Sequence, residues 1–183
     1  MRSALAAVAL LSLAACGSEP GTPKTADEVI AEAGKLERPL PGRYETSAEL
    51  IEFSIPGLPP QQAEKLHSMM GKVGGETSAY CLTPEEAEKG FEDNVRKMAQ
   101  GNQQMTCEFD RFDVEGNNLD AAMTCKMPQG MNAEISLTGK TGAEASSMRM
   151  TMVQKAAMIP GGEMRMEMQM DARRVGDCPA GGA

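Results

Sequence analysis

The chain contains 16 methionines, and many of them recur at every second position. In an extended strand alternate side chains project to the same face of a sheet, so the spacing predicts rows of thioethers on one face. Seven methionines follow this spacing: Met148, Met150, Met152, Met164, Met166, Met168 and Met170. Thioether sulfur is a soft ligand suited to Cu(I). The same flexible, apolar side chains could instead fill a core or line a pocket for an apolar molecule.

Few other residues offer chemistry. His67 is the only histidine, which rules out a Ser-His-Asp triad and a multi-histidine zinc site. It could add an imidazole to a soft-metal site. We expect no catalytic residue, no cofactor and no conventional metal centre, and therefore a protein that is not an enzyme.

The methionines also compensate for a shortage of aromatic area. Aromatic residues make up 3% of the chain, and tryptophan is absent. Because methionine adapts to irregular gaps, the simplest interpretation of the rows is a core filled with methionine.

The N-terminus carries a different chemistry. After Arg2, residues 4–15 are all apolar or small, a run shorter than the roughly 20 residues that span a bilayer and typical of a secretory signal. The segment Leu13-Ala14-Ala15-Cys16 is similar to the lipobox of bacterial lipoproteins, in which the cysteine receives a diacylglycerol thioether. We therefore expect residues 1–15 to be a signal peptide and Cys16 to be the lipidated first residue of the mature chain. Gly17, which replaces the Asp that retains enteric lipoproteins in the inner membrane, favours the periplasmic face of the outer membrane.

The formal net charge of −8 argues against nucleic acid and against electrostatic binding to anionic headgroups. The lipid on Cys16 must then supply the attachment to the membrane. Expected partners are this membrane and an apolar small molecule or a periplasmic protein.

Four cysteines remain after Cys16, and an even number in an exported chain predicts two disulfides. A hairpin turning at 115–118 places Cys107 opposite Cys125, at a separation that a disulfide can bridge. Cys81 and Cys178 then pair by elimination.

Alternating apolar and polar residues predict a series of antiparallel strands. A change of parity near Leu50-Ile51 predicts a β-bulge. The expected strands cover residues 43–55, 78–82, 105–114, 119–127, 133–141, 147–154 and 163–175.

Helical spacing appears in three places. Short helices are expected at 26–36 and 61–70. A longer helix is expected from Pro84 to Met98, with Thr83 as its N-cap and Glu86 completing a capping box. The fold class is therefore α+β, a curved antiparallel sheet of six or seven strands packed with one long and one short helix and stapled by two disulfides. We expect a flexible tether over 16–41, a single domain over 42–178 and a disordered tail over 179–183.

Several short motifs in this order resemble those of a bacterial family, domain of unknown function 3617. They are Pro41-Gly42-Arg43-Tyr44, Cys81-Leu82-Thr83-Pro84-Glu85, Gly139-Lys140-Thr141-Gly142 and Arg174-Val175-Gly176-Asp177-Cys178, together with Cys107 and Cys125 flanking a hairpin. The resemblance covers residues 40–178. It implies a small exported or lipid-anchored envelope protein and no particular reaction.

The leading hypothesis is a lipid-anchored envelope protein that binds an apolar ligand on its methionine-lined sheet face. One alternative is Cu(I) or Ag(I) binding by the Met-x-Met rows. Another is a structural lipoprotein that docks a protein partner.

Overall fold

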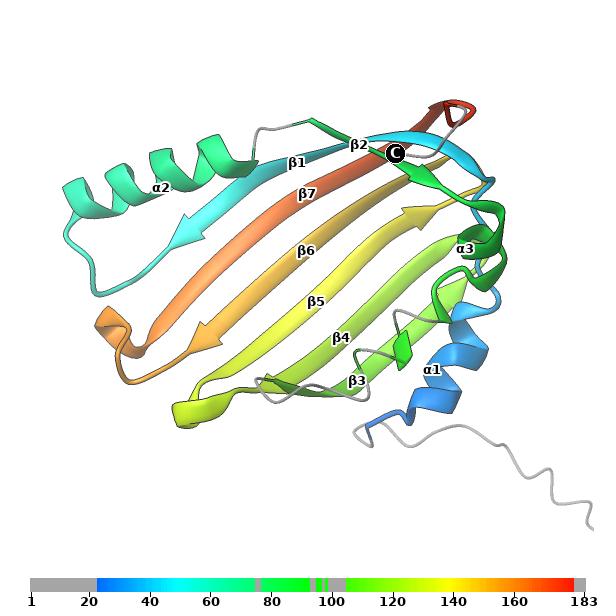
Figure 1. Ribbon diagram of the computed structural model, residues 1–183. Coiled ribbons are helices and arrows are strands. Elements are labelled where there is room, and N and C mark those ends of the chain that lie inside the picture. The colour runs from blue at the N-terminus through cyan, green and yellow to red at the C-terminus, as the bar shows by residue number, and fades with distance from the viewer. Residues whose placement is uncertain (1–22, 75–76, 93–94, 97, 99–104, 180–183) are drawn as a thin grey trace, which may run out of the picture.

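The computed structural model describes residues 23–179, apart from 75–76, 93–94, 97 and 99–104. Its main element is an antiparallel seven-stranded sheet in the order β2-β1-β7-β6-β5-β4-β3, and the sheet is open (Figure 1). The strands are β1 (Gly42–Ser54), β2 (Ser78–Leu82), β3 (Thr106–Glu115), β4 (Asn118–Lys126), β5 (Asn132–Thr141), β6 (Ala145–Lys155) and β7 (Glu163–Gly176). The expected sheet is confirmed, because alternation specifies both the strands and the face that each residue takes.

The register between the strands also follows the sequence pattern. Cys107 lies opposite Cys125 in the β3–β4 hairpin, and the two form a disulfide as expected. The register of β1 against β7 shifts between Leu50 and Glu52, where the change of parity predicted a bulge. Two further shifts lie between Arg43 and Tyr44 on β1 and between Phe109 and Arg111 on β3.

The helices differ from expectation. The longest described helix is α2 (Pro60–Gly74), which follows β1 and lies beside it at the end opposite β2 (Figure 1). The helix that begins at Pro84, α3, ends at Lys89, so the expected long helix is wrong. Gly90, at φ 55°, takes a backbone conformation that favours glycine and ends α3. Helical backbone resumes at Glu92.

The first helix, α1 (Ala26–Ala33), belongs to the domain. Thr25 and Glu28 form its capping box, Val29 is fully buried, and the backbone of Lys24 pairs with that of Phe109 on β3. The expectation of a flexible tether over 16–41 is therefore wrong for the part that the structure describes, because an amphipathic helix within it packs on the sheet. The expected signal peptide, Cys16 and the tail 180–183 lie outside the described residues.

The core lies on one face of the sheet, called here the inner face, toward the β3 edge. Its most buried large side chains are Phe109, Val29 and Cys125. Val29 comes from α1, and Val95 adds a contact from the segment after α3. Figure 1 shows α1 beside β3 and β4, while none of the described helices lies over the middle of the sheet.

Candidate binding site on the inner face

The strand register arranges the apolar side chains of the inner face in rows that cross the sheet. One row runs from Phe109 through Met123, Ile135, Met152 and Met166 to Phe53. The next runs from Phe112 through Ala121, Leu137, Met150 and Met168 to Leu50. A third runs from Leu119 through Gly139, Met148 and Met170 to Ala48. All seven methionines of the sequence pattern therefore face the same side of β6 and β7.

These rows begin in the buried core near β3 and end among partly exposed residues on β7 and β1. Met148 and Met152 pack against the core, whereas the other five methionines of the pattern are outside the core cluster and its packed neighbours. All seven are half-buried. The face predicted as one surface thus divides into a core margin on β6 and a partly exposed apolar strip formed by β7, Met150 and the adjoining half of β1.

Gly139 lies opposite Met148 in the third row and affects how this methionine packs on the surface. A Cβ at Gly139 would collide with the backbone carbonyl oxygen of Ser147 and would stand 2.8 Å from both the Cα and the sulfur of Met148. The missing side chain therefore leaves the space that this thioether occupies, and the row continues without a gap across β5.

A fourth row lies directly beyond the apolar ones and is made of small and polar residues: Thr141, Ser146, Ala172 and Thr46. Three of these, Thr141, Ser146 and Ala172, line a cavity of about 360 Å³. Its other walls come from β2, the α3 segment and the chain before β1, including Tyr80, Phe91 and Glu37.

Thr141 is the unusual residue of this cavity. It is 4% exposed, and its hydroxyl oxygen is the one buried side-chain oxygen or nitrogen of the described residues that has no hydrogen-bond partner. Such a group lowers stability by roughly 1–3 kcal/mol, and native structures contain few of them.

Tyr44 and Tyr80 stack at the side of the cavity, with ring centroids 5.6 Å apart. The hydroxyl of Tyr44 lies 2.8 Å from the carbonyl oxygen of Leu40 and 3.0 Å from that of Ala143, which anchors the chain before β1. Burial raises the pKa of both Tyr44 and Tyr80. Both rings therefore stay neutral hydrogen-bonding groups near neutral pH.

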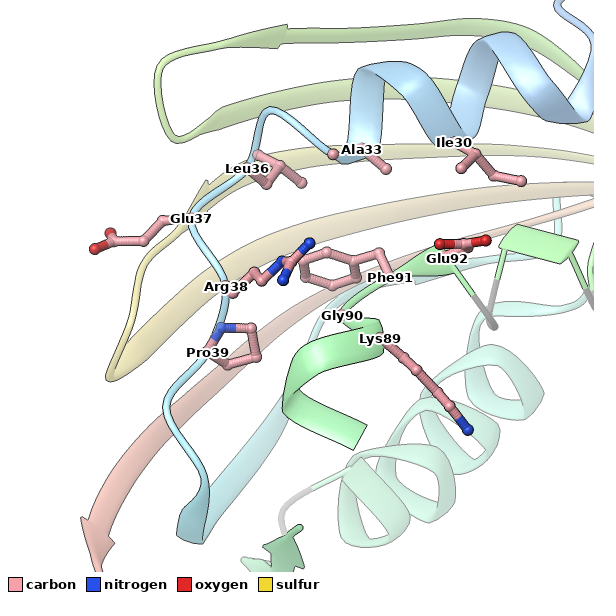
Figure 2. Close-up of a pocket in the computed structure, with 11 residues that line it drawn as sticks. Ile30, Ala33, Leu36, Glu37, Arg38, Pro39, Lys89, Gly90, Phe91 and Glu92 are labelled. Atoms are coloured by element: carbon pink, nitrogen blue, oxygen red, sulfur yellow. The ribbon is translucent and has the colours of Figure 1, made fainter. Parts of the chain in front are cut away.

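A smaller cavity of about 60 Å³ adjoins the first and shares Glu37, Pro39, Gly90 and Phe91 with it. Figure 2 shows the ring of Phe91 directed toward the chain before β1, with the guanidinium of Arg38 beside it. Phe91 therefore forms part of the wall of both cavities.

The second cysteine pair is close but unbonded. Cys81 and Cys178 are half-buried free thiols, and the side-chain hydrogen bond of Cys178 with the neighbouring Cys81 raises the pKa of Cys178 to about 11. The expected second disulfide is therefore present only as two facing thiols.

The remaining candidates do not converge on a site. His67 lies exposed on α2, and the described residues contain no group of three or more His, Cys, Asp or Glu side chains that could hold a metal. No helix in the described part is long and apolar enough to cross a membrane. Sequence reasoning missed Thr141, Ser146 and Ala172 as candidate site residues. Continuing the alternation beyond Met148 and Met170 would have placed Ser146 and Ala172 on the inner face.

The fold and its site define an open antiparallel sheet with α1 beside β3 and α2 beside β1, and an apolar strip that ends in a cavity with apolar and polar walls. The chain belongs to the family described as "Protein of unknown function (DUF3617)", whose model matches residues 39–178. No curated protein and no solved structure matches the chain.

Proposed function

We propose that this chain is a lipid-anchored protein of the bacterial cell envelope, on the periplasmic face of the outer membrane, that binds an acyl chain on its inner face without catalysing a reaction. The observation that carries the proposal is the position of Met150, Met164, Met166, Met168 and Met170 outside the core cluster. A face used only as core has no need to extend three apolar rows across strands that the described helices leave uncovered.

Methionine suits such a face. Its unbranched thioether side chain repacks around ligands of varied shape. Ligand sites are typically concave and mostly apolar, with a few polar groups that fix orientation. The methionine strip supplies the apolar surface of such a site, and the cavity at its end supplies the polar groups.

The proposed anchor keeps this face near lipid. If Cys16 carries the lipid, Lys24, whose backbone is bonded to β3, follows it by only eight residues. Eight residues span at most about 29 Å when fully extended. The domain then stays within one short reach of the bilayer, the most abundant source of acyl chains in an envelope.

Two variants of β7 test ligand binding. Met168→Asp places a charge on the apolar strip, and the matched control Gln169→Asp places the same charge on the opposite face of the sheet. We expect Met168→Asp to weaken displacement of an apolar fluorescent dye by a fatty acid at least tenfold, while Gln169→Asp has no effect. Equal effects, or protein that forms a concentration-dependent dimer through this face, would contradict the proposal.

The anchor has its own test. Replacing Cys16 by Ala should abolish incorporation of labelled palmitate and move the protein from the membrane fraction to the soluble fraction. Protein that stays with the membrane unlabelled would mean that attachment does not use this cysteine.

Soft-metal binding is a second candidate, favoured by the register. Met148 faces Met170, Met150 faces Met168, and Met152 faces Met166, so six thioethers form three directly opposed pairs on neighbouring strands. Directly opposed side chains have Cβ atoms about 4.5–5.5 Å apart. A Cu(I) titration against a competing chelator tests this, because Met→Leu replacements keep volume and apolarity but remove the ligand. An unchanged titration in the leucine series would exclude the metal.

We also propose that Cys81 and Cys178 form a disulfide in the oxidising envelope. Their thiols lie close enough for Cys81 to raise the pKa of Cys178, and the disulfide would tie β2 to the end of β7 across β1. A non-reduced digest of exported protein should contain a peptide that links the two cysteines.

A further inference from the structure

The cavity beyond the methionine strip is lined by Thr141, whose hydroxyl has no partner among the residues that the structure describes. The Thr141 side chain is almost entirely buried, and its oxygen has no acceptor or donor among the described residues. A hydroxyl in this position can both donate and accept one or more hydrogen bonds. A bound polar group is the natural partner, because a buried oxygen left unpaired destabilises the empty protein.

The position of Thr141 relates it directly to the strip. Ser146 and Ala172, which share its row, are the next inner-face positions after Met148 on β6 and Met170 on β7. Alternate residues of a strand lie about 6.6 Å apart. The cavity therefore begins one residue pair beyond the apolar rows and continues the same surface.

The charges at the cavity select the kind of polar group. Two carboxylates line it, Glu37 and Glu86, and none of the Lys or Arg residues that the structure describes does. The amide of Asn117 donates to Glu37 at 2.9 Å, and Thr83 donates to Glu86 through its backbone nitrogen and its hydroxyl. The hydrogen bonds from Thr83 lower the pKa of Glu86, so its charge persists at neutral pH. Lys140 and Arg173 line only an adjoining shallow depression.

We infer that the ligand of the proposed binding face is an amphiphile whose acyl chain lies along the methionine strip and whose uncharged, hydroxyl-bearing head occupies the Thr141 cavity. This inference rests on the proposed function. Like-charge repulsion from Glu37 and Glu86 disfavours a carboxylate or phosphate head, whereas glycerol-like hydroxyls pair with Thr141, Ser146 and Tyr80.

The dimensions agree with one chain and one head. From Met170 to Met164 the strip covers six residue steps of β7, about 20 Å at 3.3 Å per residue. One acyl layer of a bilayer is roughly 15 Å thick, half of a hydrocarbon core of about 30 Å. A chain of membrane length therefore fits on the strip when its head sits at the Ala172 end.

The test compares three probes of equal chain length: a monoacylglycerol, the corresponding fatty acid at pH 8, and the alkane. Each displaces an apolar fluorescent dye from the mature chain carrying Cys16→Ala. The key variant is Thr141→Val, which keeps the shape of the side chain and removes the hydroxyl. Thr138→Val, on the exposed outer face of the same strand, is the matched control.

We expect the monoacylglycerol to bind roughly tenfold more tightly than the fatty acid anion. Thr141→Val should weaken monoacylglycerol binding about fivefold, the effect of one hydrogen bond, and leave alkane binding unchanged. Without ligand its melting temperature should equal or exceed that of the wild type, because an unpaired hydroxyl has been removed.

Three results would count against the inference in different ways. If Thr141→Val and Thr138→Val bind the monoacylglycerol equally well, the head is not in this cavity. If the fatty acid anion binds best, the charge argument is wrong. If no probe displaces the dye from the wild type, the binding function itself fails, and the inference fails with it.

Discussion

The division of the methionine face into core margin and open strip predicts that two similar truncations have opposite consequences. Met152 on β6 packs against the core cluster, whereas Met168 on β7 lies outside it. Both are half-buried methionines on the inner face of adjacent strands. Replacing each by alanine removes the same atoms from the two regions.

The expected magnitudes follow from these surroundings. Truncating a fully buried methionine to alanine costs about 2–5 kcal/mol, so Met152→Ala, at the margin, should lower the free energy of unfolding by about 2 kcal/mol. Met168→Ala should lower it by about 1 kcal/mol or less, since part of its surface already meets water. A ligand that covers roughly 40 Å² of the Met168 side chain gains about 1 kcal/mol, so its loss weakens binding about fivefold.

The assay pairs urea unfolding with dye displacement by a monoacylglycerol for the two variants and for Met152→Leu and Met168→Leu. The leucine variants control for thioether-specific effects, because they keep volume and apolarity. Met152→Ala should mainly destabilise, and Met168→Ala should mainly weaken binding. If Met168→Ala destabilises as much as Met152→Ala and leaves binding unchanged, the strip is ordinary core and the reasoning is refuted.

Four other predictions follow from single sites. Val29→Ala should lower the free energy of unfolding in urea by about 2 kcal/mol; no loss would mean that α1 is not docked. Gly139→Val should lower the melting temperature, because its Cβ would collide with the backbone of Ser147 and Met148, and Met148→Ala should not rescue it. In reduced protein, Cys81→Ala should speed iodoacetamide alkylation of Cys178 at pH 8 by roughly ten- to a hundredfold, since the pKa falls from about 11 toward 9.0. The folded-state pKa of Cys178 is raised, so its contribution to the stability of the reduced wild type is complete below pH 9 and is lost as the pH rises from about 9 to about 11. Urea unfolding of the reduced protein at several pH values in this range measures the loss.

The sheet could be predicted because the signals that specify its strands are local in the sequence. Period-two alternation sets both the extent of a strand and its inner face. The turn at 116–117 fixes the register that brings Cys107 to Cys125, and the change of parity near Leu50 marks the bulge. Each of these signals needs only the residues next to one another in the chain.

The helices were harder to predict because their ends depend on contacts distant in sequence. Apolar spacing continues from Ala87 through Phe91 to Val95, yet the backbone turns at Gly90 and the helix breaks there. Phe91 is then directed between two cavities. Proline and glycine around 17–42 have the composition of a linker, but α1 is held by the burial of Val29 and by the pairing of Lys24 with β3, and no local pattern reports either contact.

The candidate site shows the same limit. The sequence places seven methionines on one face, but it cannot show where the core ends, since that boundary depends on how far α1 and the segment around Val95 extend over the sheet. It also cannot show that the hydroxyl of Thr141 lacks a partner among the described residues, which depends on residues that separate strands and the α3 segment bring together.

The open half of the sheet also has a physical consequence for how a ligand would be held. The β3 edge is fixed by a disulfide and by α1, whereas the strip on β7 and β1 is bordered by α2, whose described side chains include no buried residue. Local stability falls where few apolar contacts are buried, so the strip can adjust to a chain without disturbing the core. A ligand should therefore slow amide hydrogen exchange in β6, β7 and β1 and leave β3 and β4 unchanged. Uniform slowing across all seven strands would instead indicate global stabilisation, and the two halves of the inner face would then act as one unit.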